Sequence, residues 1–273
     1  MKNLPVFLVV VLALLVPLSA GAADDAGGSD AEILRFADPA VLEQARKGDA
    51  VAQFLISKAF SDVQGDASKS IYWARLATDQ GLSMAQAHLG KFYEMGVGVE
   101  RDYEQAFELF RKAAEQGDPV GALRLAGLYL AGHGVTQDDS KATALFRQAA
   151  NQNLPAAAHY YADSLVAGRG IAKDEHAAVE WYLKAAELGW LQSPRLLAAF
   201  YFDGGIVPRD MIEASKWLQV SFALMGPADA ITRDVGNLVW PRLSEAERNE
   251  GAARARDYLE NHKDAIRLAM QFQ

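Results

Sequence analysis

The chain has 273 residues, 51% of them hydrophobic, which is enough to bury a sizeable core. Its 35 Asp and Glu against 27 Lys and Arg give a net charge of −8, which argues against nucleic acid and anionic membrane surfaces as partners. Cysteine is absent, so disulfides, thiolate metal sites and cysteine nucleophiles are excluded, and stability must come from packing.

The first 22 residues have the pattern of a secretory signal peptide. Lys2 precedes an apolar stretch from Leu4 to Leu18, and small residues follow up to Ala22, where we expect cleavage. The alternative is an uncleaved membrane anchor, but the stretch is short for a span and contains Pro17. No cysteine follows that could carry a lipid. We therefore expect a periplasmic protein, in preference to a secreted one, that is not inserted in the membrane after cleavage.

Cleavage would remove only Lys2 among the charged residues, so the mature chain would carry a net charge of −9. Residues 23–37 are small, polar and acidic, and we expect a flexible linker there. Asp38 and Pro39 then predict the start of a helix. Because that helix ends in a Gly-Asp pair like the one at Gly117, residues 38–48 are interpreted as the second half of a truncated repeat.

A repeat array follows over residues 38–227. Aspartates recur every 36 residues, and glycines and alanines recur in register with them; a period of this length is typical of stacked helical arrays. The aspartates are Asp102, Asp138, Asp174 and Asp210, with Asp66 in the same position of a shorter first unit. After the half repeat, the expected units are 49–82, 83–118, 119–154, 155–190 and 191–227.

Each unit is predicted to be a helix, a glycine-containing turn and a second helix. Leu89 and Tyr93 share one helical face, Gly96 suits the left-handed residue that ends a helix, and Asp102 suits the cap of the next one. The predicted fold class is therefore all-α, a right-handed α-solenoid with a period of about 36 residues.

Residues 228–273 lie beyond the repeats. Ser244 followed by Glu247 predicts another helix start, and residues 244–260 are charged and alanine-rich. We expect capping helices that close the end of the array, since about 45 residues is short for the alternative, a separate small domain.

The repeat also resembles a known family. The run from Leu89 through Gly96, Gly98 and Asp102 to Ala106, and the run from Trp181 to Gly189, are similar to the Sel-one-like repeat, a relative of the tetratricopeptide repeats. The resemblance implies an α-solenoid that mediates protein–protein contacts. Exported members include envelope scaffolds, regulators of cell-wall machinery and immunity proteins. A cysteine-rich branch is linked to penicillin binding, which this chain has no residues to support.

The resemblance implies that one face of each first helix lines a concave groove. If Leu89 and Tyr93 point to the core, positions such as 91 and 94 point away from it. The alternative is that curvature or the C-terminal helices bury these side chains, and we expect Trp190 to pack across a unit boundary. The candidate partner-binding residues are Lys91, Glu94, Leu123, Leu130, His159, Asp163, Val166, Arg195 and Phe202.

Motifs for catalysis or cofactor binding are lacking in the sequence, which has no nucleophile elbow, no zinc-protease motif and no phosphate-binding loop. A metal site from His159 and His176 is a minor alternative. We expect a non-enzymatic protein without cofactors that binds a protein partner. An inhibitor or immunity protein is favoured over an envelope-assembly or polysaccharide-export scaffold, because the array is compact and its acidic surface suits a basic effector. A cell-wall-active hydrolase is the less favoured alternative.

Overall fold

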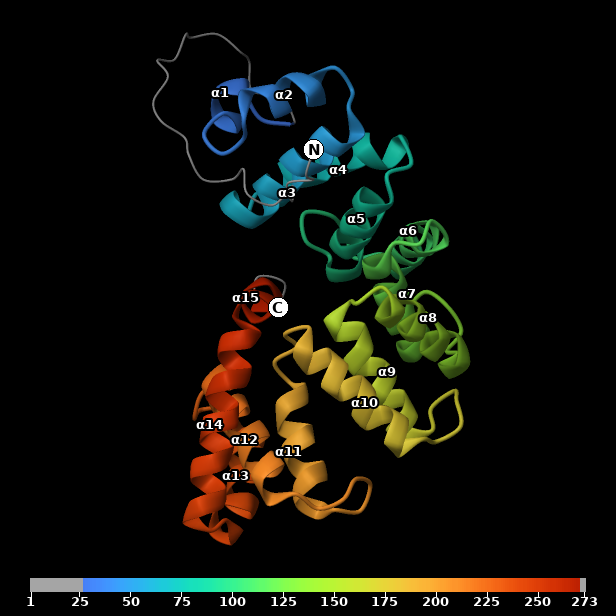
Figure 1. Ribbon diagram of the computed structural model, residues 1–273. Helices are drawn as coiled ribbons and strands as arrows, with labels where there is room; N and C mark the ends of the chain where they lie inside the picture. Colours follow the sequence, from blue (N-terminus) through green and yellow to red (C-terminus); the bar gives the residue numbers. More distant parts are fainter. Residues whose placement is uncertain (1–26, 271–273) are drawn as a thin grey trace, which may run out of the picture. The chain divides into compact units, whose positions relative to one another are not determined.

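A computed structural model describes residues 27–270, and within them every regular element is a helix (Figure 1). The expected signal peptide at residues 1–22 lies outside the described residues. The α-helices are α1 Asp30–Ile33, α2 Pro39–Arg46, α3 Ala50–Ala59, α4 Ala67–Asp79, α5 Ser83–Met95, α6 Tyr103–Glu115, α7 Pro119–Ala131, α8 Asp139–Asn151, α9 Pro155–Ala167, α10 Glu175–Glu187, α11 Ser193–Asp203, α12 Met211–Met225, α13 Ala230–Val239, α14 Glu245–Asn261 and α15 Lys263–Met270. This all-α series of helical hairpins confirms the predicted solenoid class.

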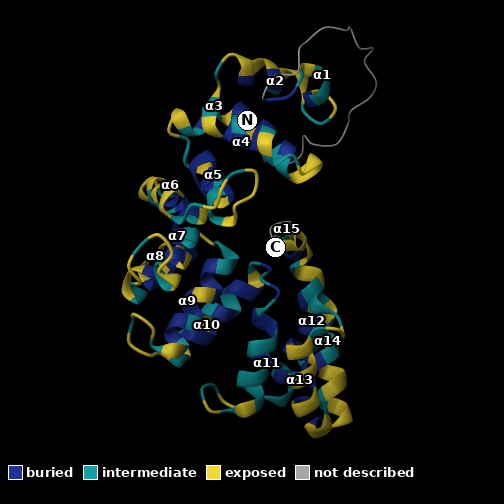
Figure 2. Cartoon of the chain, turned by 180° about the vertical axis from the view of Figure 1, so that it is seen from behind, coloured by how far each residue is buried: buried dark blue, intermediate teal, exposed yellow. Residues whose placement is uncertain are grey.

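The chain forms two compact units, which divide between Gln137 and Asp138. In the first unit, α2 to α7 pack against one another in chain order, and in the second α8 to α12 do the same. Figure 2 shows the helices buried where they face their neighbours and exposed on the opposite side. Small residues permit the close approach, since Ala106, Ala113 and Ala114 of α6 are all buried beside Phe110.

The repeated aspartates are helix caps, as the sequence predicts. The side chain of Asp102 accepts hydrogen bonds from the backbone N–H groups of Glu104 and Gln105, which satisfies donors at the start of α6. The backbone N–H of Asp102 donates to the carbonyl of Tyr93 at 2.9 Å and closes the turn. Asp66, Asp138, Asp174 and Asp210 cap α4, α8, α10 and α12 in the same way.

The turns after α5, α7 and α9 use their two glycines differently. Gly96 ends α5 in the left-handed conformation, with a φ of 68°, as the sequence predicts. The second glycine of the turn lies against the start of the preceding second helix. A Cβ at Gly134 would be 2.5 Å from the carbonyl oxygen of Tyr103, and one at Gly170 would be 2.2 Å from that of Asp139. These glycines therefore let each turn pack closely against the second helix of the preceding repeat.

Within residues 27–37, the structure shows a short helix and core contacts where the sequence predicts part of a flexible linker over residues 23–37. Residues 30–33 form α1, and Ile33 is fully buried in a core cluster with Leu42, Ile56 and Phe60. The Trp73 indole N–H also donates to the carbonyl of Gly27 at 2.7 Å. Residues 27–37 pack here because their few apolar side chains complete the core of the first hairpin, a role that the polar residues around them hide in the sequence.

The first hairpin also lacks the glycine turn of the later units. A short π-helix, η1 Phe60–Gln64, continues α3, and Gly65 then takes the left-handed conformation with a φ of 67°. One left-handed glycine thus ends this helix, where the turns after α5, α7 and α9 each use two.

The C-terminal helices cover the last repeat, as predicted. A capping box between Ser244 and Glu247 starts α14, which packs along α12. Gly251 of α14 permits this approach, because a Cβ there would be 2.4 Å from the Ser215 hydroxyl oxygen. The Tyr258 hydroxyl donates to the carbonyl of Ala186 at 2.6 Å. Between these helices, α13 and the short 3-10 helix η2 Trp240–Arg242 turn the chain.

Candidate partner-binding surface

The candidate residues of the first unit lie on α5 and α7, with different degrees of exposure. Lys91 is exposed, and partial burial together with the nearby Arg124 and Lys58 lowers its pKa below the usual value. Glu94 is half-buried and pairs with Arg124 at 3.4 Å, which ties α5 to α7. Leu123 and Leu130 of α7 are half-buried.

Two of the candidate residues on α9, His159 and Asp163, belong to a polar network that is buried at its histidine end. His159 is only 5% exposed, and its Nδ1 lies 3.1 Å from the Ser193 hydroxyl. Its Nε2 lies 3.8 Å from the carboxylate of Asp163, which accepts a hydrogen bond from the Tyr182 hydroxyl. Trp190 packs its ring on His159, so it contacts the first helix of its own unit. Val166 of α9 is half-buried.

This Ser–His–Asp arrangement does not form an accessible active site. Ser193 is fully buried at the start of α11, and a nucleophile must reach its substrate. Burial, acting against Asp163, lowers the pKa of His159 and keeps the imidazole neutral. The network therefore holds α9 and α11 together.

The candidate residues on α11 have partners among the C-terminal elements. The Arg195 guanidinium lies 3.7 Å from the Asp229 carboxylate, at the start of α13. The ring of Phe202 lies beneath two guanidinium groups, those of Arg209 at 5.3 Å and Arg242 at 5.5 Å. At this end of the second unit, the C-terminal elements reach side chains that the sequence places in an open groove.

The first unit presents an apolar surface that the sequence analysis missed. The second residue of each of its first helices is a large apolar side chain, and these are exposed by 46%, 44% and 44%, with Leu55 one turn further along α3 exposed by 39%. Lys58 and Lys91 follow on the same helical faces. We call this surface the α3–α5–α7 face; its residues are Val51, Leu55, Lys58, Met84, Lys91 and Val120.

Side-chain contacts join the three helices of this face. Phe54 of α3 meets the ring of His88 of α5 edge-on at 5.9 Å, and the Glu94–Arg124 pair joins α5 to α7. Lys58 pairs with Asp62 at 2.8 Å. Among residues 27–270, no acidic side chain forms an ion pair with Lys91, so one positive charge beside the apolar side chains is left for a partner.

No group of three or more His, Asp or Glu side chains within the described part of the chain is arranged to hold a metal ion. His159 is enclosed by Ser193 and aromatic rings, whereas His176 is exposed in the first turn of α10. Within residues 27–270, no helix combines the length and the apolar character that crossing a membrane requires.

Two solved structures resemble this chain at 26% and 27% sequence identity. A protective antigen present in uropathogenic Escherichia coli strains, which displays an SLR fold, has 26% identity and a TM-score of 0.74 over 85% of this chain and 50% of its own. This chain thus spans about half the length of that relative. A Sel1 repeat protein from Oxalobacter formigenes has 27% identity and a TM-score of 0.63, with coverage of 77% and 88%.

A third structure, a Sel1 repeat protein from Klebsiella pneumoniae, shares the fold at 24% identity and a TM-score of 0.51, over 73% of this chain and 98% of its own. No curated protein matches the chain. The family model of the Sel1 repeat matches residues 50–82, 83–118, 119–154, 155–190 and 195–221. Sel1 repeats mediate protein–protein interaction, and proteins built from them are generally non-catalytic scaffolds. The matched ranges cover more than half of the sequence, and the chain therefore belongs to the Sel1 repeat family.

Proposed function

We propose that this protein is a non-enzymatic binding protein whose α3–α5–α7 face takes up a protein partner. The observation that carries the proposal is the row of Val51, Met84 and Val120, exposed at one equivalent position in three consecutive repeats. Isolated exposed apolar residues need no explanation, but a row of them at one position of three successive first helices, beside a lysine without an ion pair among the described residues, has the composition of a protein interface.

The proposed site of action is the bacterial envelope. The support is the sequence pattern of residues 1–22, whose basic start, apolar stretch and Ala-x-Ala end are typical of an exported protein. Within that compartment we propose an inhibitor or immunity role against a secreted effector, and an envelope-assembly scaffold is the alternative use of the same face.

Capture of partners from periplasmic extract tests the proposal. The bait is the full chain, tagged at its C-terminus and exported by its own leader, in native form and as the Met84→Glu plus Val120→Glu double variant. Binding would bury the two glutamates against the apolar surface of the partner, which opposes the complex. Recovery of the partner should therefore fall at least about tenfold.

Leu238→Glu is the matched control, because Leu238 of α13 is exposed to a similar degree, 55%, outside the face. The pair Leu130→Glu plus Phe202→Glu tests the groove expected from the sequence. Equal recovery by the Met84 and Val120 double variant, with a native circular-dichroism spectrum, would refute the α3–α5–α7 face as the contact.

The captured partner then separates the roles. An inhibitor lowers the activity of a purified effector at a stoichiometric ratio, whereas a scaffold leaves its partner active and co-purifies with envelope complexes. Purified protein should not turn over cell-wall or lipid substrates, and turnover that survives repurification would favour the hydrolase alternative.

A further inference from the structure

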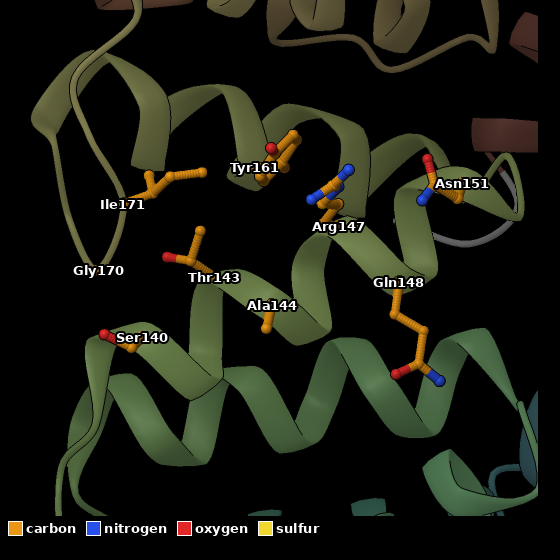
Figure 3. A pocket seen from close by; sticks show the side chains of 9 residues that line it. All are labelled: Ser140, Thr143, Ala144, Arg147, Gln148, Asn151, Tyr161, Gly170 and Ile171. Carbon is orange, nitrogen blue, oxygen red and sulfur yellow. The ribbon is translucent and has the colours of Figure 1, made fainter.

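One face of α8 borders an open depression of about 460 Å³ in the second unit (Figure 3). Its floor is a stripe of α8 side chains at helical spacing, and its far wall is Tyr161 of α9 with Ile171 of the following turn. Figure 3 shows Arg147 projecting from α8 toward Tyr161, with Asn151 further along the helix. No acidic side chain lines this depression.

The repeat itself supplies a comparison for Arg147. One repeat earlier, the equivalent Arg111 donates to Glu108 and Glu115 of its own helix, at 2.6 Å each. Thirty-six residues on, the positions of these two glutamates hold Ala144 and Asn151.

The arginine is therefore kept while both of its intrahelical carboxylates are replaced. Within the described residues, no carboxylate forms an ion pair with Arg147, although the chain as a whole has an excess of acidic residues.

The surroundings of Arg147 fit a carboxylate on a peptide. A planar guanidinium donates two parallel hydrogen bonds to a carboxylate, and the Asn151 amide and Ser140 hydroxyl offer further donors along the same helix face. Thr143 is already used, since its hydroxyl donates to the Arg169 carbonyl at 2.7 Å. Half-buried Ile171 provides apolar surface beside the charge, and the Tyr161 ring, held edge-on by Trp181 at 5.2 Å and only 6% exposed, forms the wall behind it.

We propose that this depression binds an acidic side chain of an extended segment of a protein partner. Arg147 receives the carboxylate, and an apolar neighbour of the acidic residue packs against Ile171. The site is separate in its residues from the α3–α5–α7 face and does not depend on it. It gives the second unit its own contact with a partner.

Nuclear magnetic resonance titration of the mature full chain tests the site. The probe is the acetylated, amidated tripeptide Leu-Glu-Leu, and the matched peptide carries Gln in place of Glu. A single bidentate contact with a short peptide should bind with a dissociation constant on the order of 1 mM. The Arg147 side-chain N–H and the α8 amides should shift saturably with the Glu peptide, and at least about tenfold more weakly with the Gln peptide.

Two variants distinguish a defined binding site from non-specific electrostatic attraction of the peptide. Arg147→Gln should weaken binding of the Glu peptide at least about tenfold. In the Ala144→Glu plus Asn151→Glu variant, Arg147 is kept but regains the partners that Arg111 has, so binding should be lost to the same extent. The Met84→Glu plus Val120→Glu variant should bind the peptide normally, which keeps this test independent of the proposed function.

Three results would overturn the proposal. The first is no saturable shift in α8 up to tens of millimolar Glu peptide. The second is equal binding by the Ala144→Glu plus Asn151→Glu variant. The third is tighter binding of inorganic phosphate than of the Glu peptide, which would make the depression a site for phosphate instead of a protein carboxylate.

Discussion

The ionisation of His88 of α5 depends on how the first unit packs around it. Its imidazole lies edge-on to Phe92 at 5.0 Å, and its Nε2 is 3.2 Å from the Ser70 hydroxyl. Burial, followed by Lys58 and Lys91, lowers its pKa to about 4, and Asp62 acts in the opposite direction. The neutral form is therefore the native form.

This lowered pKa makes stability depend on pH. The unfolded chain takes up a proton near its ordinary histidine pKa of about 6.5, before the folded chain does. Stability is therefore complete above about pH 6.5 and declines as the pH falls toward 4. Between pH 7.5 and 5 the loss due to His88 should be about 2 kcal/mol.

We expect His88→Gln to reduce the difference in the free energy of unfolding between pH 7.5 and 5 by roughly that amount. Urea unfolding at both pH values measures it. His159, whose pKa is also lowered by burial, should leave a residual loss of the same sign. His176→Gln, a change at an exposed position, is the control, and an unchanged pH dependence in His88→Gln would contradict the argument.

Individual residues were predictable from the sequence where their role is local. Asp102 and the other repeated aspartates can be read as caps because a cap needs only the next three residues of the chain. Arg195 could not be assigned in the same way, because its partner Asp229 lies 34 residues on in the C-terminal part. The sequence does indicate that Arg147 lacks an intrahelical ion pair, because the two glutamates that flank Arg111 are replaced around it. Only a comparison of one repeat with the next reveals this.

At the scale of elements, the second glycine of the turns after α5, α7 and α9 fixes the distance between consecutive hairpins. Gly98, Gly134 and Gly170 all lie against the first residue of the preceding second helix: Ala67, Tyr103 and Asp139. The sequence identifies them as turn residues, but not as contact residues, because the contact belongs to a neighbouring repeat. The spacing of the array thus depends on the absence of a side chain.

Substitution of Gly170 by alanine should therefore cost more than its position in an exposed turn suggests. Its φ is +67° and a Cβ would lie 2.2 Å from the Asp139 carbonyl oxygen, so we expect a loss of about 2 kcal/mol or more. Gly127→Ala is the matched control, since a Cβ in the middle of α7 meets nothing within 4 Å and should stabilise by about 0.5–1 kcal/mol. Thermal unfolding of both variants decides; similar shifts would contradict the contact.

The α3–α5–α7 face shows how little a single helix reveals about which of its residues are exposed. If Leu89 and Tyr93 of α5 point to the core, position 87, one turn before position 91, should point outward like it. Ala87 is only 4% exposed, whereas Met84 is 44% exposed. Each first helix packs against its own second helix and against its neighbours, so the exposed stripe is narrower than a single helical wheel suggests, and its edge is set by other repeats.

At the scale of the whole molecule, a stack of repeats needs a closed end. The closing helix α14 places Tyr258 against Trp217 of α12, with ring centroids 4.9 Å apart, and Arg254 pairs with Glu213 at 3.0 Å. The sequence predicts this cap from its charged, alanine-rich pattern. It does not predict that α13 and η2 also reach Arg195 and Phe202, because that depends on how the chain turns after α12.

Removal of residues 245–273 should therefore destabilise the second unit while leaving the first intact. Trp217 is 2% exposed with α14 in place, and uncovering it together with the α12 surface should cost several kcal/mol, on the order of 3 or more. Because stability in repeat arrays is mostly a sum of nearest-neighbour terms, amides in α3 and α4 should keep their protection from hydrogen exchange, while those in α11 and α12 lose it.

Tyr258→Phe is the graded control: it removes only the hydroxyl that donates to the Ala186 carbonyl and should cost about 1–2 kcal/mol of stability. Loss of protection in α3 and α4 to the same extent would show that the array unfolds as one cooperative block, against the nearest-neighbour argument.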